Sequence, residues 1–216
     1  MEKEKRHTEN KKKYLETIKK LEIELFSEFK NGDDIHTPEG NSYFYFAPSR
    51  HVNTRLITKT DINDLISDDS KTLLSIGSGS AFLERLLVKL GVKKENITLS
   101  DIDPKHLPKE FKSKIFDMYG SRTDLGDEKY DLIIFPESVL INRISGANYQ
   151  GRRIEFLYHL ILQALQHLKS NGKIKMSIQS ENLNINKIKQ RLRKRSYKLR
   201  IALRNNLLEV KDEATV

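Results

Sequence analysis

The sequence has 216 residues, enough for one domain with a substantial hydrophobic core, and its 39 Lys and Arg against 30 Asp and Glu give a formal net charge of +9. Cysteine is absent, which excludes disulfides, thiolate metal sites and cysteine nucleophiles. Apolar runs stay well short of the roughly 20 residues of a membrane-spanning helix, and the charged residues 1–13 are unlike a secretory signal peptide, so we expect a cytoplasmic protein without a membrane partner.

Residues 1–70 are expected to form a helical N-terminal extension that serves as a lid. Apolar residues recur at three- and four-residue steps from Lys12 to Lys30, the pattern of an amphipathic helix, and Asn31 and Gly32 end it. Residues 33–49 predict a loop with one short extended piece, because Pro and Gly surround a cluster of aromatic residues. Residues 61–66 predict a capped helical turn.

From Thr72 onward, short apolar runs alternate with amphipathic stretches, which is typical of βαβ units around a parallel sheet. The runs predict strands at residues 72–76, 97–100, 113–116, 130–135, 173–178, 198–203 and 207–211. The amphipathic stretches predict helices at residues 81–90, 153–168 and 185–195, with Gly172 as a left-handed cap beyond the second of these. The last two strands are joined by three residues and are therefore antiparallel neighbours.

A turn containing two glycines follows the first of these strands. Gly77, Ser78 and Gly79 stand between a buried strand and a helix, where residues without side chains let the backbone bend sharply and approach a ligand. Asp101 follows about 22 residues beyond Gly79, at the end of the second strand, where a carboxylate can accept both ribose hydroxyls of an adenosine cofactor. Phe82 stands where a dinucleotide fingerprint has its third glycine, which disfavours nicotinamide and flavin dinucleotides.

In these features residues 71–211 resemble the class I S-adenosylmethionine-dependent methyltransferase family. The resemblance implies a Rossmann-like α/β fold with a seven-stranded, mostly parallel sheet, helices on both faces and a C-terminal antiparallel hairpin. It implies that residues 71–216 form the S-adenosylmethionine-binding domain. Residues 165–178 are similar to the family's segment of helix, glycine and fifth strand.

The resemblance also implies which residues contact S-adenosylmethionine. Asp101 would bind the ribose, Ile102 would lie against the adenine, and the acid after the third strand, Asp117, would lie near the adenine amino group. The fourth-strand motif, residues 130–138, would line the floor beneath the reactive methyl. The implied cofactor contacts are Ser75, Gly77, Ser78, Gly79, Asp101, Ile102, Asp117, Met118 and Pro136.

The chain departs from the family's pattern at two positions. Ser75 stands where the family has an acid that engages the methionine end of the cofactor, and Ala81 stands where it has a third glycine. Serine forms hydrogen bonds but does not pair with an ammonium group as a carboxylate does. Glu84 is a candidate to compensate for the missing acid, and Arg50 or Arg55 to bind the methionine carboxylate.

The methyl acceptor is less well marked, because methyl transfer mainly requires that the acceptor be positioned and, where necessary, deprotonated. Glu137, just past the fourth strand, is the candidate catalytic residue, and the alternative is a plain carboxylate at a helix N-terminus. Phe135, Pro136 and Glu137 differ from the family's motif for amino acceptors, so adenine and glutamine amino groups are disfavoured.

The N-terminal extension contains the candidates for substrate contact. The aromatic cluster and its basic neighbours either cover the site or pack on the sheet with only the tyrosines half exposed. These candidates are Tyr45, Arg50, His51 and Arg55. The histidines lack metal-type spacing, so we expect no metal site.

Residues 187–204 contain nine Lys and Arg and no acid. A run of this density can hold a phosphate backbone, with Arg191, Arg193 and Arg195 as candidate contacts and RNA as the favoured polymer. The alternative is a solvated helix face followed by an edge strand that charge protects from aggregation. The sequence therefore predicts an S-adenosylmethionine-dependent methyltransferase, with an inactive binding module of the same fold or a non-catalytic nucleic-acid-binding protein as alternatives.

Overall fold

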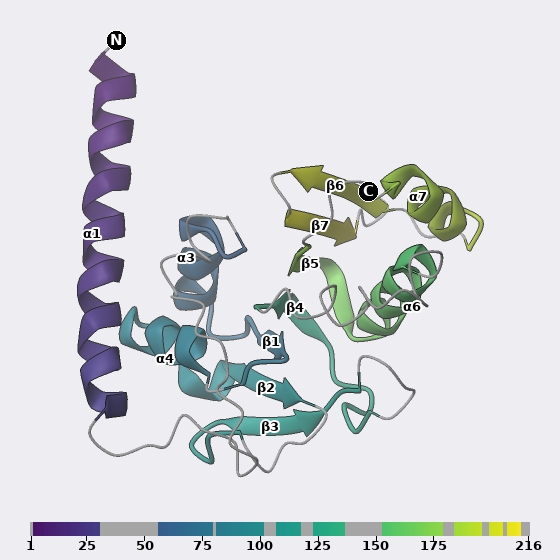
Figure 1. Cartoon of the computed structure of the whole chain (residues 1–216), viewed down its shortest axis with the longest axis horizontal. Coiled ribbons are helices and arrows are strands. Elements are labelled where there is room, and N and C mark those ends of the chain that lie inside the picture. Colours follow the sequence, from purple (N-terminus) through teal and green to yellow (C-terminus); the bar gives the residue numbers. More distant parts are fainter. Residues whose placement is uncertain are drawn as a thin grey trace.

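A computed structural model describes residues 2–30, 56–79, 81–101, 107–117, 123–136, 153–178, 184–195, 199–204 and 207–212. A seven-stranded sheet separates two layers of helices (Figure 1). Its strands are β1 (Leu73–Ile76), β2 (Ile97–Asp101), β3 (Lys112–Ile115), β4 (Tyr130–Phe135), β5 (Leu168–Ser177), β6 (Leu199–Arg204) and β7 (Leu207–Asp212). The helices are α1 (Glu2–Lys30), α3 (Lys59–Ser67), α4 (Phe82–Lys89), α6 (Arg153–Gln166) and α7 (Ile185–Arg193), with a short 3-10 helix, η1 (Lys94–Asn96).

The strand order is β3-β2-β1-β4-β5-β7-β6. The strands β1 to β5 are all parallel, whereas β7 is antiparallel to both of its neighbours, β5 and β6. The chain moves from β1 outward to β3 and then returns to β4 on the other side of β1. Ligands of open α/β sheets bind outside the carboxyl ends of the strands at such a reversal. The topology therefore predicts a ligand site at the carboxyl ends of β1, β2 and β4.

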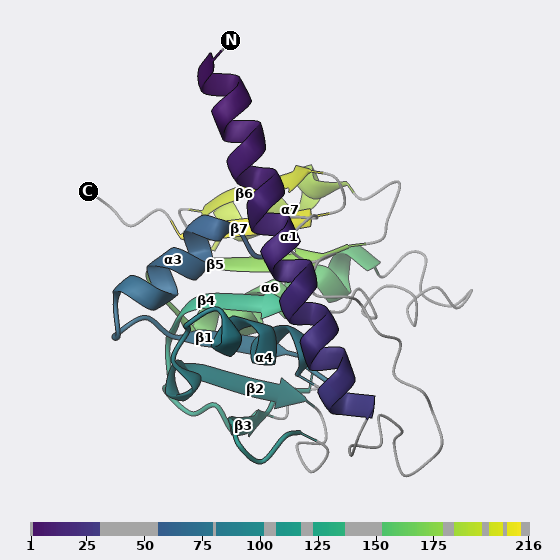
Figure 2. The same ribbon diagram turned by 90° about the vertical axis from the view of Figure 1, so that its left-hand side faces the viewer.

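Alternate residues of the central strands face two different cores, as the pleat of a strand requires. Leu73, Leu132 and Ile134 pack with residues of α3 and α4. Leu74, Ile133 and Phe135 pack with residues of α6 and α7. Figure 2 shows α1, α3 and α4 in front of the sheet and α6 behind it. The expected fold, with helices on both faces and a C-terminal antiparallel hairpin, is confirmed.

The helix α1 packs on α4 and then extends beyond the sheet (Figures 1 and 2). Ile18 and Leu25 of α1 are buried in one cluster with Phe82 and Leu86 of α4. Residues 2–13 contain no apolar residue, so the projecting part of the helix has a wholly polar sequence. That residues 1–70 act as a lid stays a prediction. Among the helices in the described ranges, none is long and apolar enough to cross a membrane.

A buried ion pair fixes α3 to the sheet. The Nζ of Lys175 in β5 lies 2.5 Å from Oδ2 of Asp61, and the Nζ of Lys173 lies 3.1 Å from Oδ1. Asp61 also completes a capping box with Thr58, whose backbone N–H donates to Oδ2 over 2.8 Å. Burial raises the pKa of the Asp61 carboxyl, but Lys175 and Thr58 outweigh that effect and hold the pKa below its usual value.

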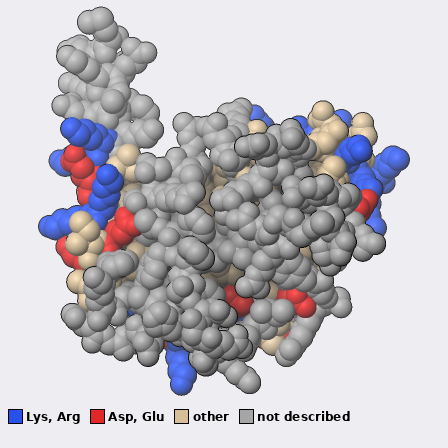
Figure 3. All heavy atoms as spheres, in the orientation of Figure 1, with Lys and Arg blue, Asp and Glu red and all other residues tan. Residues whose placement is uncertain are grey.

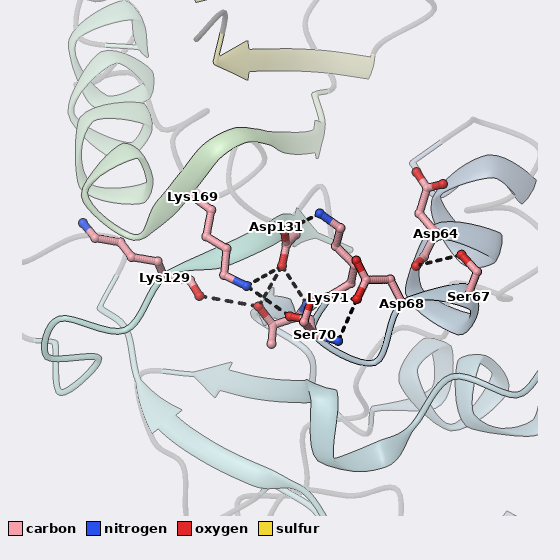
Figure 4. Close-up of polar contacts among 9 residues, drawn as sticks. Asp64, Ser67, Asp68, Ser70, Lys71, Lys129, Asp131 and Lys169 are labelled. Carbon is pink, nitrogen blue, oxygen red and sulfur yellow. Dashed lines mark hydrogen bonds and ion pairs between the residues drawn. The ribbon is translucent and has the colours of Figure 1, made fainter.

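A second polar network ties the amino ends of the strands together (Figure 4). Asp131, near the start of β4, accepts hydrogen bonds from the Nζ of Lys71 over 3.0 Å and the Nζ of Lys169 over 2.7 Å. The backbone N–H of Thr72 donates to the same carboxylate over 2.9 Å. This network lies at the edge opposite the carboxyl ends of the strands, so we assign it a structural role.

Within the described residues the predicted strands and helices are present with shifts at their ends, and the loop predicted at residues 33–49 lies outside them. The largest shift is at α1, which begins at Glu2 instead of Lys12, because residues 2–13 contain no apolar residue that would mark the helix. A second difference lies between α6 and β5. The helix ends at Gln166 and β5 begins at Leu168, so the predicted end at residue 168 and the left-handed cap at Gly172 were wrong. Asn171 is the left-handed residue, with φ of 63°. A Cβ on Gly172 would lie 2.8 Å from Cδ1 of Leu168, so the glycine is explained by close packing instead.

Candidate functional site

The turn after β1 is built from alternating left-handed residues. The angle φ is 71° at Gly77, 51° at Gly79 and 55° at Ala81. Glycine adopts this conformation without strain, whereas an alanine in it costs about 1–2 kcal/mol. Ala81 therefore keeps the backbone shape that a glycine would have provided. Its N–H donates to the carbonyl of Ser78 over 2.8 Å, which closes the turn and begins α4 at Phe82.

Asp101 lies beside this turn. The backbone N–H of Gly77 donates to the carbonyl of Ser100 over 2.7 Å, and Asp101 is the next residue and the last of β2. The carbonyl of Asp101 in turn accepts from the N–H of Phe116 over 3.1 Å, one residue before Asp117. The glycine turn and the two predicted carboxylates thus occupy neighbouring strand ends, and both carboxylate residues are half-buried.

On the other side of β1, the buried Pro136 follows the end of β4. The structure therefore brings most of the predicted cofactor contacts to one edge of the sheet, and their binding roles stay predictions. The residues brought together are Ser75, Gly77, Ser78, Gly79, Asp101, Asp117 and Pro136. The remaining candidates lie outside the described residues: Tyr45, Arg50, His51, Arg55, Ile102, Met118 and Glu137.

Glu84 lies at the base of the turn, in the first turn of α4. Its side chain faces β1, where the hydroxyl of Ser75 donates a hydrogen bond to Oε1. The residue is only 1% exposed, and Oε2 finds no hydrogen-bond partner within the described part of the chain. Burial raises the pKa of the Glu84 carboxyl to about 7, although the hydrogen bond from Ser75 opposes the shift. The carboxyl can therefore change its charge near neutral pH.

Ser100 is a residue of this edge that the sequence did not single out. Its carbonyl accepts from Gly77, and its buried hydroxyl, like that of Ser78, lacks a partner among the residues described. The available signal was a serine in an otherwise apolar strand, directly before Asp101. Unpartnered buried hydroxyls are uncommon, so their occurrence at the ends of β1 and β2 marks this edge as one where buried polar atoms still lack partners.

The nucleic-acid candidates lie on and just beyond α7, which packs against α6. Ile188 and Leu192 are the buried face of α7, while Arg191, Arg193 and Arg195 are exposed. Arg191 is engaged by α6: its guanidinium lies 3.0 Å from Oε1 of Glu155 and stacks over Tyr158. Basic side chains are visible at this end of the molecule, on the right of Figure 3.

Across the described ranges there is no cluster of three or more histidine and acidic side chains placed to hold a metal ion.

Comparison with known proteins shows similarity of structure without similarity of sequence. No protein-family model matches the chain, and no curated protein matches it. A methyltransferase from Pyrococcus furiosus has a TM-score of 0.50 and 14% identity, with 84% of this chain and 93% of that chain covered. The CurJ carbon methyltransferase has a TM-score of 0.50 and 13% identity, with 80% of this chain and 57% of that chain covered.

A putative ribosomal RNA methyltransferase from Plasmodium falciparum has a TM-score of 0.46 and 12% identity, with 79% of this chain and 97% of that chain covered. At these identities the likeness is one of fold. The chain has the Rossmann-like α/β fold of class I S-adenosylmethionine-dependent methyltransferases.

Proposed function

We propose that the chain is an S-adenosylmethionine-dependent methyltransferase. The observation that carries the proposal is the glycine turn, which is hydrogen-bonded to the end of β2 directly beside Asp101, where the strand order reverses. A backbone that can be approached closely, next to a carboxylate that can accept two ribose hydroxyls, suits an adenosine cofactor.

The buried polar atoms of this edge also fit S-adenosylmethionine. That cofactor has hydroxyl, amino and charged groups along its length, and Oγ of Ser78 and Oε2 of Glu84 are buried without partners in the part of the chain described. An apolar ligand would leave both of them desolvated and unpaired, at a cost of about 1–3 kcal/mol each.

S-adenosylmethionine supplies a methyl group that its sulfonium has already activated. The work of the protein is then to hold the two reactants in line and to exclude water. In this proposal Asp101 orients the ribose, and the backbone of the glycine turn lies along the cofactor. Glu137 stays the candidate for contact with the acceptor.

For the acceptor we propose RNA. The support is the group of exposed Lys and Arg on and beside α7 and β6, which we call the basic surface. It consists of Lys187, Arg193, Lys194, Arg195 and Arg200. Residues 187–204 include no acid that would neutralise it, and the basic side chains repeat along a helix and an adjacent edge strand, as contacts to successive phosphates require.

Calorimetric titration of S-adenosylmethionine and S-adenosylhomocysteine tests the cofactor assignment. The wild type should bind both, and Asp101→Ala should weaken binding about 10- to 100-fold through loss of hydrogen bonds to a charged acceptor. Asp127→Ala, an exposed carboxylate in the turn before the amino end of β4, is the matched control and should bind normally. No binding to the wild type would refute the methyltransferase and leave the fold as a module with another role.

Fluorescence anisotropy with a single-stranded RNA at increasing salt tests the acceptor. In Arg193→Gln/Arg195→Gln the slope of log affinity against log salt should fall by about 0.7 for each phosphate that the protein no longer neutralises. Lys12→Gln/Lys13→Gln removes the same charge from exposed positions of α1 and should leave the slope unchanged. An RNA affinity that changes neither with salt nor with the arginine substitutions would exclude the basic surface as the RNA-binding site. RNA binding without cofactor binding would favour a non-catalytic nucleic-acid-binding protein.

A further inference from the structure

The helix that follows the glycine turn carries a buried carboxylate with a hydrogen-bond partner on one oxygen only. Glu84 reaches from α4 toward β1, its Oε1 accepts from Ser75, and its Oε2 is buried without a donor among the described residues. No Lys or Arg of the described ranges forms an ion pair with it. A fully buried carboxylate with a bare oxygen is either protonated or paired with a cation that comes from outside these residues.

The contact between Ser75 and Glu84 explains why the acid is absent from the strand. Their side chains touch, so a carboxylate at residue 75 would lie against the carboxylate at residue 84. Two buried carboxylates in contact do not both ionise near neutral pH, because like charges raise the pKa of one of them. One of the two positions can carry the charge, and in this chain it is the helix position.

The cofactor of the proposed function has cationic groups at one end only. Adenosine is neutral near pH 7, whereas the methionine end carries an ammonium group and, in S-adenosylmethionine, a sulfonium. Asp101, at the end of β2, is suited to the ribose. The Glu84 carboxylate, which lies in α4 beside β1, is then left for the methionine end, where an N–H donor of the ammonium can satisfy Oε2.

We propose that Glu84 binds the ammonium group of the cofactor's methionine end through Oε2, while the hydroxyl of Ser75 holds Oε1. The proposal rests on the proposed cofactor and assigns one of its binding residues. In this proposal the carboxylate that the family has at the position of Ser75, in β1, is replaced by the carboxylate of Glu84 in α4, and cofactor binding is retained. Ser75 acts as a positioning residue, because its hydrogen bond fixes the rotation of the carboxylate.

The test compares two ligands that differ in the group at issue. S-adenosylhomocysteine has the ammonium, and 5′-methylthioadenosine has the same nucleoside but lacks the amino-acid end. Calorimetry should find that Glu84→Gln weakens S-adenosylhomocysteine binding about 10- to 100-fold and leaves 5′-methylthioadenosine binding unchanged. A glutamine that merely disturbed the turn would weaken both. Glu95→Gln, at an exposed position of η1, is the control for loss of one negative charge.

The exchange variant Ser75→Asp/Glu84→Ser gives the test a second arm. It returns the carboxylate to the strand and keeps a hydroxyl facing it, so it should restore most of the S-adenosylhomocysteine affinity that Glu84→Gln loses. The wild type could bind both ligands while Glu84→Gln affects them equally or affects neither. That result would overturn the role of Glu84 and leave the cofactor assignment intact. No wild-type binding of either ligand would overturn both.

Discussion

Replacing Glu84 by glutamine should change how the stability of the protein depends on pH. The carboxyl has a pKa of about 7 in the folded chain, against an ordinary value of 4.5. Between these two values the folded state keeps a proton that the unfolded state has lost. The contribution of Glu84 to the free energy of unfolding therefore falls by about 3 kcal/mol as pH rises through this window, since each pKa unit corresponds to about 1.4 kcal/mol.

The variant has a neutral amide of the same size and lacks this loss. We expect Glu84→Gln to gain about 3 kcal/mol relative to the wild type between about pH 4.5 and pH 7, with no further change at higher pH. Urea unfolding followed by circular dichroism, at fixed ionic strength, measures the difference between the two chains, so the other titrating groups cancel.

This pH dependence requires that the Glu84 carboxyl be buried in the folded chain. Glu95→Gln removes an exposed carboxyl and is the control for loss of one negative charge. If the difference between Glu84→Gln and the wild type were constant from about pH 5 to about pH 8, the Glu84 carboxyl would not be desolvated in the folded chain. Both the pKa assignment and the burial of Oε2 would then be refuted.

Three further substitutions probe the scaffold by the same unfolding measurement. Lys175→Met leaves Asp61 buried without its closest cation and should lower the free energy of unfolding by about 3–5 kcal/mol. The double variant Asp61→Asn/Lys175→Met should lose less stability, because no charge is left buried alone. An equal loss in the single and double variants would contradict the buried ion pair. Gly172→Ala places a methyl 2.8 Å from Leu168 and should cost about 1–3 kcal/mol, and unchanged stability would contradict the close packing at this glycine. Ile18→Ala should cost about 2–5 kcal/mol by opening the contact between α1 and α4, while Ile23→Ala, 70% exposed on the same helix, should change little.

Much of this fold could be predicted from short stretches of the sequence. Residues 73–76 are buried and apolar except for Ser75, and residues 132–135 are a continuous apolar run. Both faces of these strands are covered, and this is the pattern expected of parallel strands. Asp101 was found by spacing alone, since the distance from the glycine turn to the next strand end is set by the length of one helix and its loops. The topology then places Asp101 next to Gly77 without any further information.

Contacts between residues far apart in the chain could not be predicted from local sequence patterns. Lys175 alternates with apolar neighbours in β5, which predicts a solvent-facing side chain, yet Asp61, 114 residues earlier, covers and neutralises it. The bend at Asn171 was assigned to Gly172 because sequence marks both residues as suited to turns, and the packing of Leu168 decides between them. The burial of Glu84 depends on how α4 lies against β1, so its position in the sequence made it a candidate without revealing its bare oxygen.

The position of β7 sets the order in which the sheet can be completed during synthesis. Within the described residues β6 pairs with β7 alone, and β7 also pairs with β5. A growing chain therefore makes β6 before the strand that connects it to the sheet exists. Until residues 207–212 have been added, β5 and β6 both present open edges, and open edges promote pairing with other chains. A nascent chain that stalled between these two strands would thus be prone to aggregate even though most of its sheet had already formed.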